Sequence, residues 1–262
     1  MPTRAQTIAP PAASDVTVVV DRSGSMASCG TAINEGVGEI IQKHAENSRK
    51  MPGTPYTLRI VSFDNRVKIL YTGAVTDLLE ADSDVLDATK MKPIYEGLIP
   101  RGTTRLIQTL SEELDSQKTR IDAIRASWHR SVRDLNPRIA ATIAVLTDGM
   151  DNVGGDLAHL LKQVENHQTH LDATCQFVAA NQNAQETGGR YGFKPELCLQ
   201  MDADPVHARA AMNSLAASSA RAVSGMDPTF SGVERLTSSI TPFIDNSSWA
   251  PSFPLQAMPT RN

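Results

Sequence analysis

The order of hydrophobic and polar positions predicts several short strands along this chain. Two continuous apolar runs, Val16–Val20 and Ile139–Thr147, are typical of strands that are buried on both faces of a sheet. The segments Tyr56–Phe63 and Val67–Tyr71 are separated by only three polar residues, which predicts a hairpin and therefore one antiparallel strand at the edge of the sheet. Two further strands are predicted at Ala173–Ala180 and Leu197–Met201.

Apolar residues at helical spacing fill the intervals between these strands. The predicted helices are marked by Ile33, Leu106, Leu157 and Val206, and Asp156 is placed to cap the third of them. Alternating strands and helices predict an α/β fold of the doubly wound, Rossmann-like class. We expect a mostly parallel six-stranded sheet with one antiparallel edge strand and with helices on both faces.

Proline-rich segments at both ends suggest arms outside one central domain. We expect a flexible N-terminal arm over residues 1–14, one domain over residues 15–223 and an extended C-terminal arm over residues 224–262. The C-terminal arm carries several large apolar side chains, among them Trp249, which are unusual in a solvated tail. We therefore expect this arm to lie along the domain or a neighbouring subunit, with Trp249 as an anchor.

Composition excludes several classes of protein. The formal net charge is −4 and the basic residues are scattered, which argues against binding to nucleic acid. No apolar run approaches the length of a membrane span, and the first residues lack the apolar core of a signal peptide. The three cysteines fit neither a disulfide framework nor a zinc site. We expect a cytoplasmic protein, with a virion as the alternative location.

Three polar motifs adjoin the predicted strands and helices. They are Asp21-Arg22-Ser23-Gly24-Ser25 after the first strand, Gly102-Thr103-Thr104 before the Leu106 helix, and Thr147-Asp148-Gly149-Met150-Asp151-Asn152 after the strand at Ile139–Thr147. Ligands of open α/β sheets bind at the carboxyl ends of the strands. Together the three motifs supply carboxylate and hydroxyl oxygens, which suit Mg²⁺ or Mn²⁺ better than zinc or copper.

Together, the three motifs resemble the metal-ion-dependent adhesion site (MIDAS) of the von Willebrand factor A family. The resemblance covers residues 15–223 and includes five expected positions: Asp21, Ser23, Ser25, Thr104 and Asp148. It departs from the family pattern at Thr103, which stands where the second glycine of Gly-Gly-Thr is expected.

The resemblance implies a metal site that binds a partner protein rather than a catalytic site. The hydroxyls of Ser23, Ser25 and Thr104 would bind Mg²⁺, or Mn²⁺ or Ca²⁺, directly. Asp21 and Asp148 would do so directly or through water, and an Asp or Glu of the partner would complete the shell. Beside the metal, we expect four partner-binding residues: Arg22, Thr103, Asp151 and Trp249. For Asp151 and Asn152, a role in the loop turn is the other interpretation.

The chain is most similar to a bacterial and phage subgroup of this family. That similarity rests on Phe63-Asp64 after the second strand, on the segment Thr147–Asn152 and, more loosely, on Ala179–Ala184. Asp64 itself is interpreted as a turn residue.

Two other functions remain open at this point. The terminal arms suggest a structural subunit of a large assembly, such as a virion. A Mg²⁺-dependent phosphohydrolase of the haloacid dehalogenase type also has an aspartate after its first strand. That chemistry needs a second aspartate two residues later, where this chain has Ser23.

Overall fold

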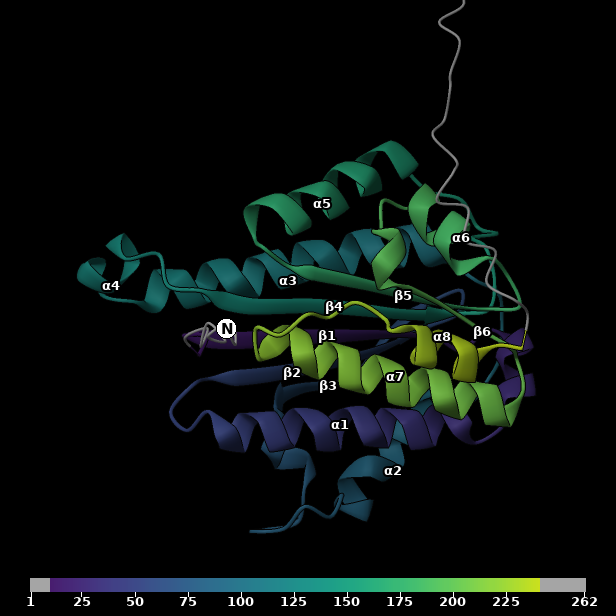
Figure 1. Ribbon diagram of the computed structural model, residues 1–262, viewed down its shortest axis with the longest axis horizontal. Helices are drawn as coiled ribbons and strands as arrows, with labels where there is room; N and C mark the ends of the chain where they lie inside the picture. The colour runs from purple at the N-terminus through teal and green to yellow at the C-terminus, as the bar shows by residue number, and fades with distance from the viewer. Residues whose placement is uncertain (1–9, 241–262) are drawn as a thin grey trace, which may run out of the picture.

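The computed structural model describes residues 10–240, and its centre is a six-stranded sheet (Figure 1). Of the arms expected at residues 1–14 and 224–262, residues 1–9 and 241–262, with Trp249, lie outside the described residues. Residues 13 and 14 do not belong to a flexible arm, because the first strand begins at Ala13. The strand order is β3-β2-β1-β4-β5-β6, and only β3 is antiparallel to its neighbour. The strands are β1 (Ala13–Asp21), β2 (Tyr56–Phe63), β3 (Val67–Ala74), β4 (Ile139–Thr147), β5 (Thr174–Ala180) and β6 (Cys198–Met201).

The central strands are buried on both faces, as their continuous apolar sequences predict. Every residue of β1 and of β4 is buried, whereas every residue of the edge strand β3 is partly or fully exposed. The two strands pair in parallel with Val20 opposite Leu146, so both end at the same edge of the sheet. The predicted fold class is confirmed.

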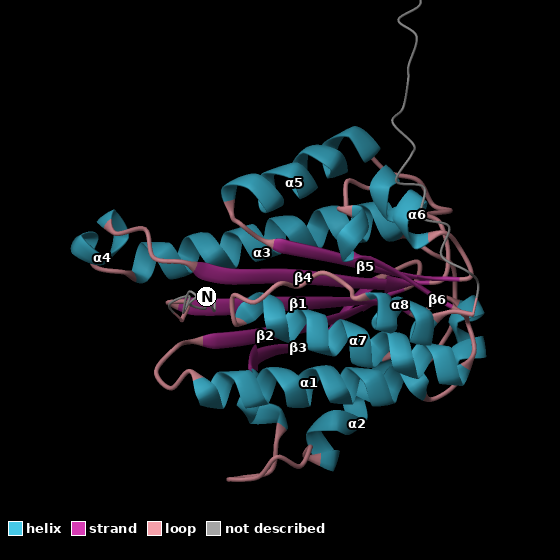
Figure 2. Ribbon diagram, viewed as in Figure 1, coloured by secondary structure: helices cyan, strands magenta, loops and turns pink. Residues whose placement is uncertain are grey.

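Helices cover both faces of the sheet (Figure 2). The side that includes α1 and α7 has an apolar core built on Val16, Val18 and Val20 of β1. On the other side, α3 and α5 lie over alternate residues of β1, β4 and β5. The helices are α1 (Ala32–Lys50), α2 (Ala88–Gly97), α3 (Leu106–Ser127), α4 (Arg130–Asp134), α5 (Leu157–His170), α6 (Ala184–Arg190), α7 (Pro205–Val223) and α8 (Gly232–Ser238).

Several helices were not predicted from the hydrophobic pattern. Helix α2 is short and contains Pro93, and α6 contains two consecutive glycines, so neither shows a long apolar period. The expectation of an extended arm from residue 224 is wrong for residues 232–238, because they form α8. A capping box between Ser231 and Glu234 begins this helix.

No helix within residues 10–240 is both long enough and apolar enough to cross a membrane.

A candidate metal centre at the carboxyl edge of the sheet

The carboxyl ends of β1 and β4 bring the first and third motifs together. Asp21 is the last residue of β1 and Thr147 is the last residue of β4. The Thr147 hydroxyl donates a hydrogen bond of 2.6 Å to Oδ2 of Asp21. This bond joins the two strand ends and places Asp148, the next residue of the chain, beside Asp21.

Ser23 connects the remaining groups of the first motif to Asp148. Its backbone N–H donates to Oδ1 of Asp21 at 2.7 Å, and its hydroxyl donates to Oδ1 of Asp148 at 3.2 Å. The hydroxyl oxygens of Ser23 and Ser25 are 3.2 Å apart. Four of the five predicted ligands therefore form one continuous set of hydrogen-bonded contacts.

Thr104 reaches the same place from the segment that leads into α3. The Thr104 N–H donates to Oδ1 of Asn152 at 3.0 Å, and the Asn152 N–H donates to the Thr104 carbonyl at 3.1 Å. The Thr104 hydroxyl lies 3.3 Å from the point that a Cβ on Gly149 would occupy. Because Gly149 follows Asp148, the Thr104 hydroxyl lies close to the third motif.

The departure from the family pattern at Thr103 is accommodated by the preceding residue. Gly102 has a φ of +74°, a conformation that favours glycine, whereas Thr103 is not among the residues with positive φ. A Cβ on Gly102 would lie 3.1 Å from the Cβ of Asp64, so the close approach also requires glycine. Thr103 is exposed and is free to contact a partner.

The electrostatics of Asp21 favour a bound cation. The pKa of Asp21 is raised to about 6; burial is the largest cause, and the nearby Asp148 also raises it. Hydrogen bonds from Thr147 and Ser23 act in the opposite direction. Neither Asp21 nor Asp148 forms an ion pair with any described lysine, arginine or histidine.

Buried carboxylates elsewhere in the described residues do have cationic partners. Asp15 pairs with Arg120, Asp64 pairs with Arg22 and Arg101, and Glu113 pairs with Arg59. A buried charge without a partner is costly. Two carboxylates and three hydroxyls that lack a countercharge fit a hard divalent cation, and the donor set matches Mg²⁺ or Mn²⁺.

Arg22 does not have the position that the sequence led us to expect. Its side chain is only 4% exposed, and its guanidinium binds Asp64 at 3.1 Å and the Gly97 carbonyl at 3.1 Å. Contact between this side chain and a partner does not fit that burial. Asp64 also accepts a bond from the N–H of Arg66, which agrees with its interpretation as a turn residue.

Asp151 acts within the protein. Its Oδ1 accepts a hydrogen bond of 3.0 Å from the Ile107 N–H in the first turn of α3, and its Oδ2 accepts a bond from the Gly154 N–H. The residue that precedes α3, Arg105, provides no side-chain cap, so Asp151 supplies that function from another loop. This contact supports the loop role of Asp151 over partner binding.

A second acidic group at the β6–α7 connection was not predicted. Asp202, Asp204 and His207 have potential ligand atoms within 4.8 Å of one another, and the spacing Asp-x-Asp-x-x-His is the signal in the sequence. Asp204 already caps α7 through the N–H groups of Val206 and His207. Asp202 accepts hydrogen bonds from Ser239 and Ile240, so local structure accounts for both carboxylates.

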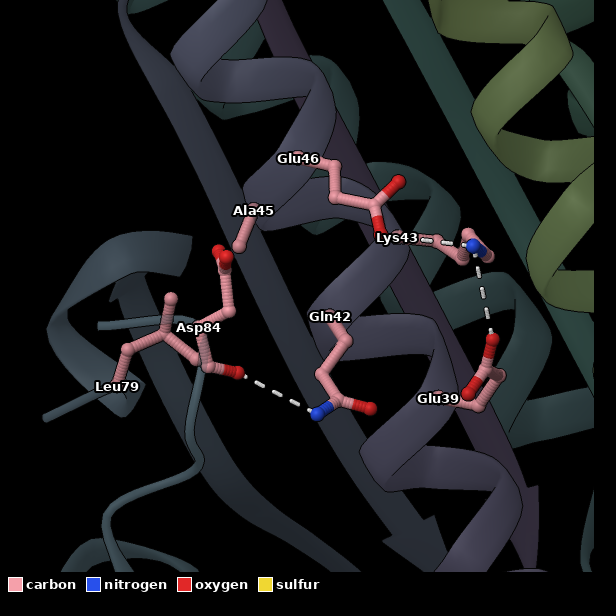
Figure 3. A pocket seen from close by; sticks show the side chains of 7 residues that line it. All are labelled: Glu39, Gln42, Lys43, Ala45, Glu46, Leu79 and Asp84. Carbon is pink, nitrogen blue, oxygen red and sulfur yellow. Dashed lines mark hydrogen bonds and ion pairs between the residues drawn. The ribbon is translucent and has the colours of Figure 1, made fainter.

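A hollow of about 230 Å³ lies beside α1 and is lined by residues of this helix together with Leu79 and Asp84 (Figure 3). Its charged side chains have partners: Lys43 contacts Glu39 at 3.9 Å and Glu46 at 3.5 Å, and Asp84 contacts Arg49. Each of these carboxylates has a cationic partner and is at least a third exposed, unlike the buried Asp21, so the hollow is a weaker candidate for a site.

Comparison with known proteins gives matches among solved structures. No family model matches the chain, and a search of curated proteins finds no match. The open conformation of the pilus adhesin SpaC from Lactobacillus rhamnosus GG matches with a TM-score of 0.52 and 14% identity, over 82% of this chain and 30% of that protein.

Two further structures have lower TM-scores. Proximal thread matrix protein 1 from the mussel byssus, with a zinc-occupied MIDAS motif, has a TM-score of 0.49 and 12% identity over 82% of this chain and 49% of that one. The ArnB paralog VWA2 from Sulfolobus acidocaldarius has a TM-score of 0.45 and 14% identity, over 79% of this chain and 46% of that one. The chain thus spans less than half the length of each of the three proteins.

The similarity at these low identities concerns the fold. That fold is a mostly parallel six-stranded sheet with a single antiparallel edge strand and with helices on both faces. The chain has the fold of the von Willebrand factor A domain.

Proposed function

We propose that this protein is a binding module that uses a divalent cation to hold a partner protein. The cation is bound by Asp21, Ser23, Ser25, Thr104 and Asp148, and it accepts a carboxylate from an Asp or Glu of the partner. The metal is Mg²⁺ or Mn²⁺, with Ca²⁺ as a weaker fit to this donor set. The module is not an enzyme.

One observation carries this proposal. Two carboxylates from neighbouring strand ends lie with three hydroxyls at the carboxyl edge of the sheet, and no described cationic side chain neutralises them. A cation would supply the missing charge. Five protein groups also leave room in an octahedral shell for an outside ligand.

Calorimetric titration of the purified chain with Mg²⁺, Mn²⁺ and Ca²⁺ separately tests the metal site. We expect one site per chain, lost in Asp21→Ala and in Ser23→Ala. The control is Thr76→Ala, which removes a hydroxyl outside the three motifs. This variant should bind the metal with the affinity of the parent protein. Equal binding by parent and Asp21→Ala protein would contradict the proposal.

Affinity capture from a lysate, with and without a chelator, tests the partner interaction. We expect specific partners to be retained with Mg²⁺ and released by the chelator, and to be absent with Asp21→Ala as bait. Partners that stay bound after both treatments would show that the metal does not form the bridge.

A structural role in an assembly is a second candidate function. Val233 and Leu236 of α8 and the nearby Ile240 are 70%, 72% and 80% exposed, an unusual group of apolar side chains within the range expected for the C-terminal arm. Deleting residues 241–262 and measuring particle size by light scattering tests this role. An unchanged size would argue against it.

A phosphohydrolase would turn over a generic aryl phosphate in the presence of Mg²⁺, and Asp21→Asn would abolish the reaction. We expect no turnover, because Ser23 occupies the position of the required acid–base aspartate.

A further inference from the structure

A layer of buried polar side chains lies between the sheet and α3. We call this layer the polar belt. It consists of Asp15, Thr17, Arg59, Glu113, Gln117 and Arg120. Three of its members come from one face of α3, and the other three come from β1 and β2. Five of the six are at most 9% exposed, and Arg120 is partly buried, so the belt is part of the interior and not a solvated surface.

The first connection across the belt joins β2 to α3. Nε of Arg59 donates to Glu113 at 2.6 Å, and Nη2 of Arg59 donates to the other carboxylate oxygen at 2.9 Å. This is a two-pronged ion pair, whose planar geometry permits little displacement of either partner. Nη1 of Arg59 also donates to Thr72 of β3 at 3.0 Å, which holds the guanidinium on the sheet side.

The second connection joins β1 to the next two turns of α3. Arg120 donates to both oxygens of Asp15 at 2.8 Å and to the hydroxyl of Thr17 at 2.7 Å. Nε2 of Gln117 donates to the Asp15 carboxylate at 3.1 Å and to the Thr142 carbonyl of β4 at 2.9 Å. The belt therefore binds α3 to three adjacent strands.

The belt divides the core on this side of the sheet into two parts. On the metal side, Leu106, Leu110 and Leu114 of α3 pack on Val19 of β1. At the opposite end, Ile121 of α3 lies in a separate apolar cluster with Ala13. The same face of β1 therefore presents, in order toward the metal site, the apolar Ala13, two members of the belt, the apolar Val19 and finally Asp21.

The two kinds of layer constrain α3 differently. Apolar packing between a leucine ridge and a sheet is non-directional, and ridges of similar leucines recur every turn of the helix. Moving α3 along its axis by one turn, about 5.4 Å, would keep much apolar contact. The same movement would separate Arg59 from Glu113 and Asp15 from Arg120, which would leave buried charges unpaired.

We propose that the polar belt sets the axial position of α3 and, through it, the position of Thr104 beside Asp21 and Asp148. Thr104 lies two residues before the first residue of α3, so a displacement of the helix moves its hydroxyl. The members of the belt are positioning residues and do not touch the metal. This inference rests on the proposed metal site.

The test replaces the Arg59–Glu113 pair by an apolar pair, Arg59→Leu with Glu113→Leu, so that no unpaired charge remains. Calorimetry with Mn²⁺ measures the metal affinity, and thermal unfolding without metal measures stability. We expect the affinity to fall about tenfold or more, as for other residues that orient metal ligands. We expect the unfolding midpoint to stay at or above that of the parent protein.

Two further variants keep the test decisive. Gln117→Met removes the hydrogen bonds of an uncharged member and should lower the affinity several-fold even if the leucine pair fails to fold. The exposed pair Lys118 and Asp122 on the same helix provides the control, since Lys118→Gln with Asp122→Asn should leave the affinity unchanged.

A crystal structure of the metal-free variants separates this inference from the proposed function. We expect Thr104 to move away from Gly149 in the belt variants, whether or not the parent protein binds metal. Unchanged metal affinity in folded belt variants, or a Thr104 that stays in place, would overturn the inference. Absence of metal binding by the parent protein would overturn the proposed function alone.

Discussion

Asp15 and Asp21 lie on the same face of β1 and are equally buried, but only Asp15 has a cationic partner among the described residues. Asp15, in the polar belt, is 0% exposed and accepts hydrogen bonds from Arg120 and Gln117. Asp21, six residues later at the strand end, is 1% exposed and has only hydroxyl and N–H donors. Arg120 neutralises the charge of Asp15, whereas no described cationic side chain neutralises the charge of Asp21.

This difference separates structural charges from functional ones. Burial alone does not identify a site, because Asp15, Asp64 and Glu113 are also buried. The distinguishing property of Asp21 is that it lies beside a second carboxylate, Asp148, without a described cationic side chain as partner. Perturbed, unpaired acids at the end of a parallel strand indicate a binding site.

Removing one partner from the belt should have the largest effect on stability. Arg59→Ala leaves Glu113 buried without its cation, and we expect a loss of about 3–5 kcal/mol in the free energy of unfolding. Urea denaturation of the metal-free protein measures this loss. The exposed Lys118→Gln variant is the control and should change stability by less than about 1 kcal/mol. A loss this small for Arg59→Ala would contradict the structural role of the belt.

His44 is a third buried titratable group, and unlike Asp15 and Asp21 it is a base whose burial favours the neutral form. His44 lies between the hydroxyls of Tyr56 and Ser219, at 2.5 and 2.9 Å, and burial lowers its pKa from 6.5 to about 4. Its contribution to stability is therefore complete above pH 6.5 and is lost as the pH falls toward 4, by about 3 kcal/mol in total.

Chemical denaturation between pH 7 and pH 4 measures this contribution of His44. The parent protein should lose more stability over that range than His44→Gln, because glutamine does not titrate. Parallel curves for the two proteins would show that protonation of His44 is not opposed by burial.

Removing the charge of a buried residue at the proposed metal site should weaken metal binding without reducing the stability of the fold. Asp21→Asn removes the carboxylate charge while the side chain keeps nearly the same size. We expect the affinity for Mn²⁺ to fall at least roughly 100-fold. The metal-free variant should be as stable as the parent or more so, because burial opposes the charge of Asp21 and raises its pKa to about 6. Calorimetry and thermal unfolding give the two readings. A marked loss of metal-free stability would place Asp21 in the same class as Asp15.

The smallest effect should come from Asp151→Ala. This change removes the acceptor for the Ile107 N–H at the start of α3. We expect a loss of about 1 kcal/mol in stability, as for other helix caps, and a metal affinity lower by less than about tenfold. Asp156→Ala, which removes the cap of α5, should cost similar stability and leave the metal affinity unchanged. An equal effect of both variants on metal binding would contradict a role of the Asp151 cap in positioning the start of α3, which Thr104 precedes by two residues.

The sequence predicts the sheet because its strands are nearly continuous apolar segments. The ranges Tyr56–Phe63 and Ile139–Thr147 are confirmed to the residue, and Asp156 caps α5 as expected. Helices α2 and α8 were missed because neither has a long apolar period, although Asp87 and Ser231 cap their first turns.

The candidate site was predicted only in part. Strand ends determine where Asp21 and Asp148 lie, so the motifs alone indicate their proximity. The burial of Arg22 depends on its pairing with Asp64, a residue in a distant turn. The polar belt depends on contacts between residues about 50 to 100 positions apart, such as Arg59 with Glu113 and Asp15 with Arg120, and no short motif marks such pairs.

The most direct test is a crystal grown with Mn²⁺ and examined by anomalous scattering. We predict one strong peak at the carboxyl edge of the sheet, within about 2.0–2.6 Å of the Ser23 and Ser25 hydroxyls and beside Asp21, Thr104 and Asp148. A peak at Asp202, Asp204 and His207 instead, or no peak between β1 and β4, would contradict the account.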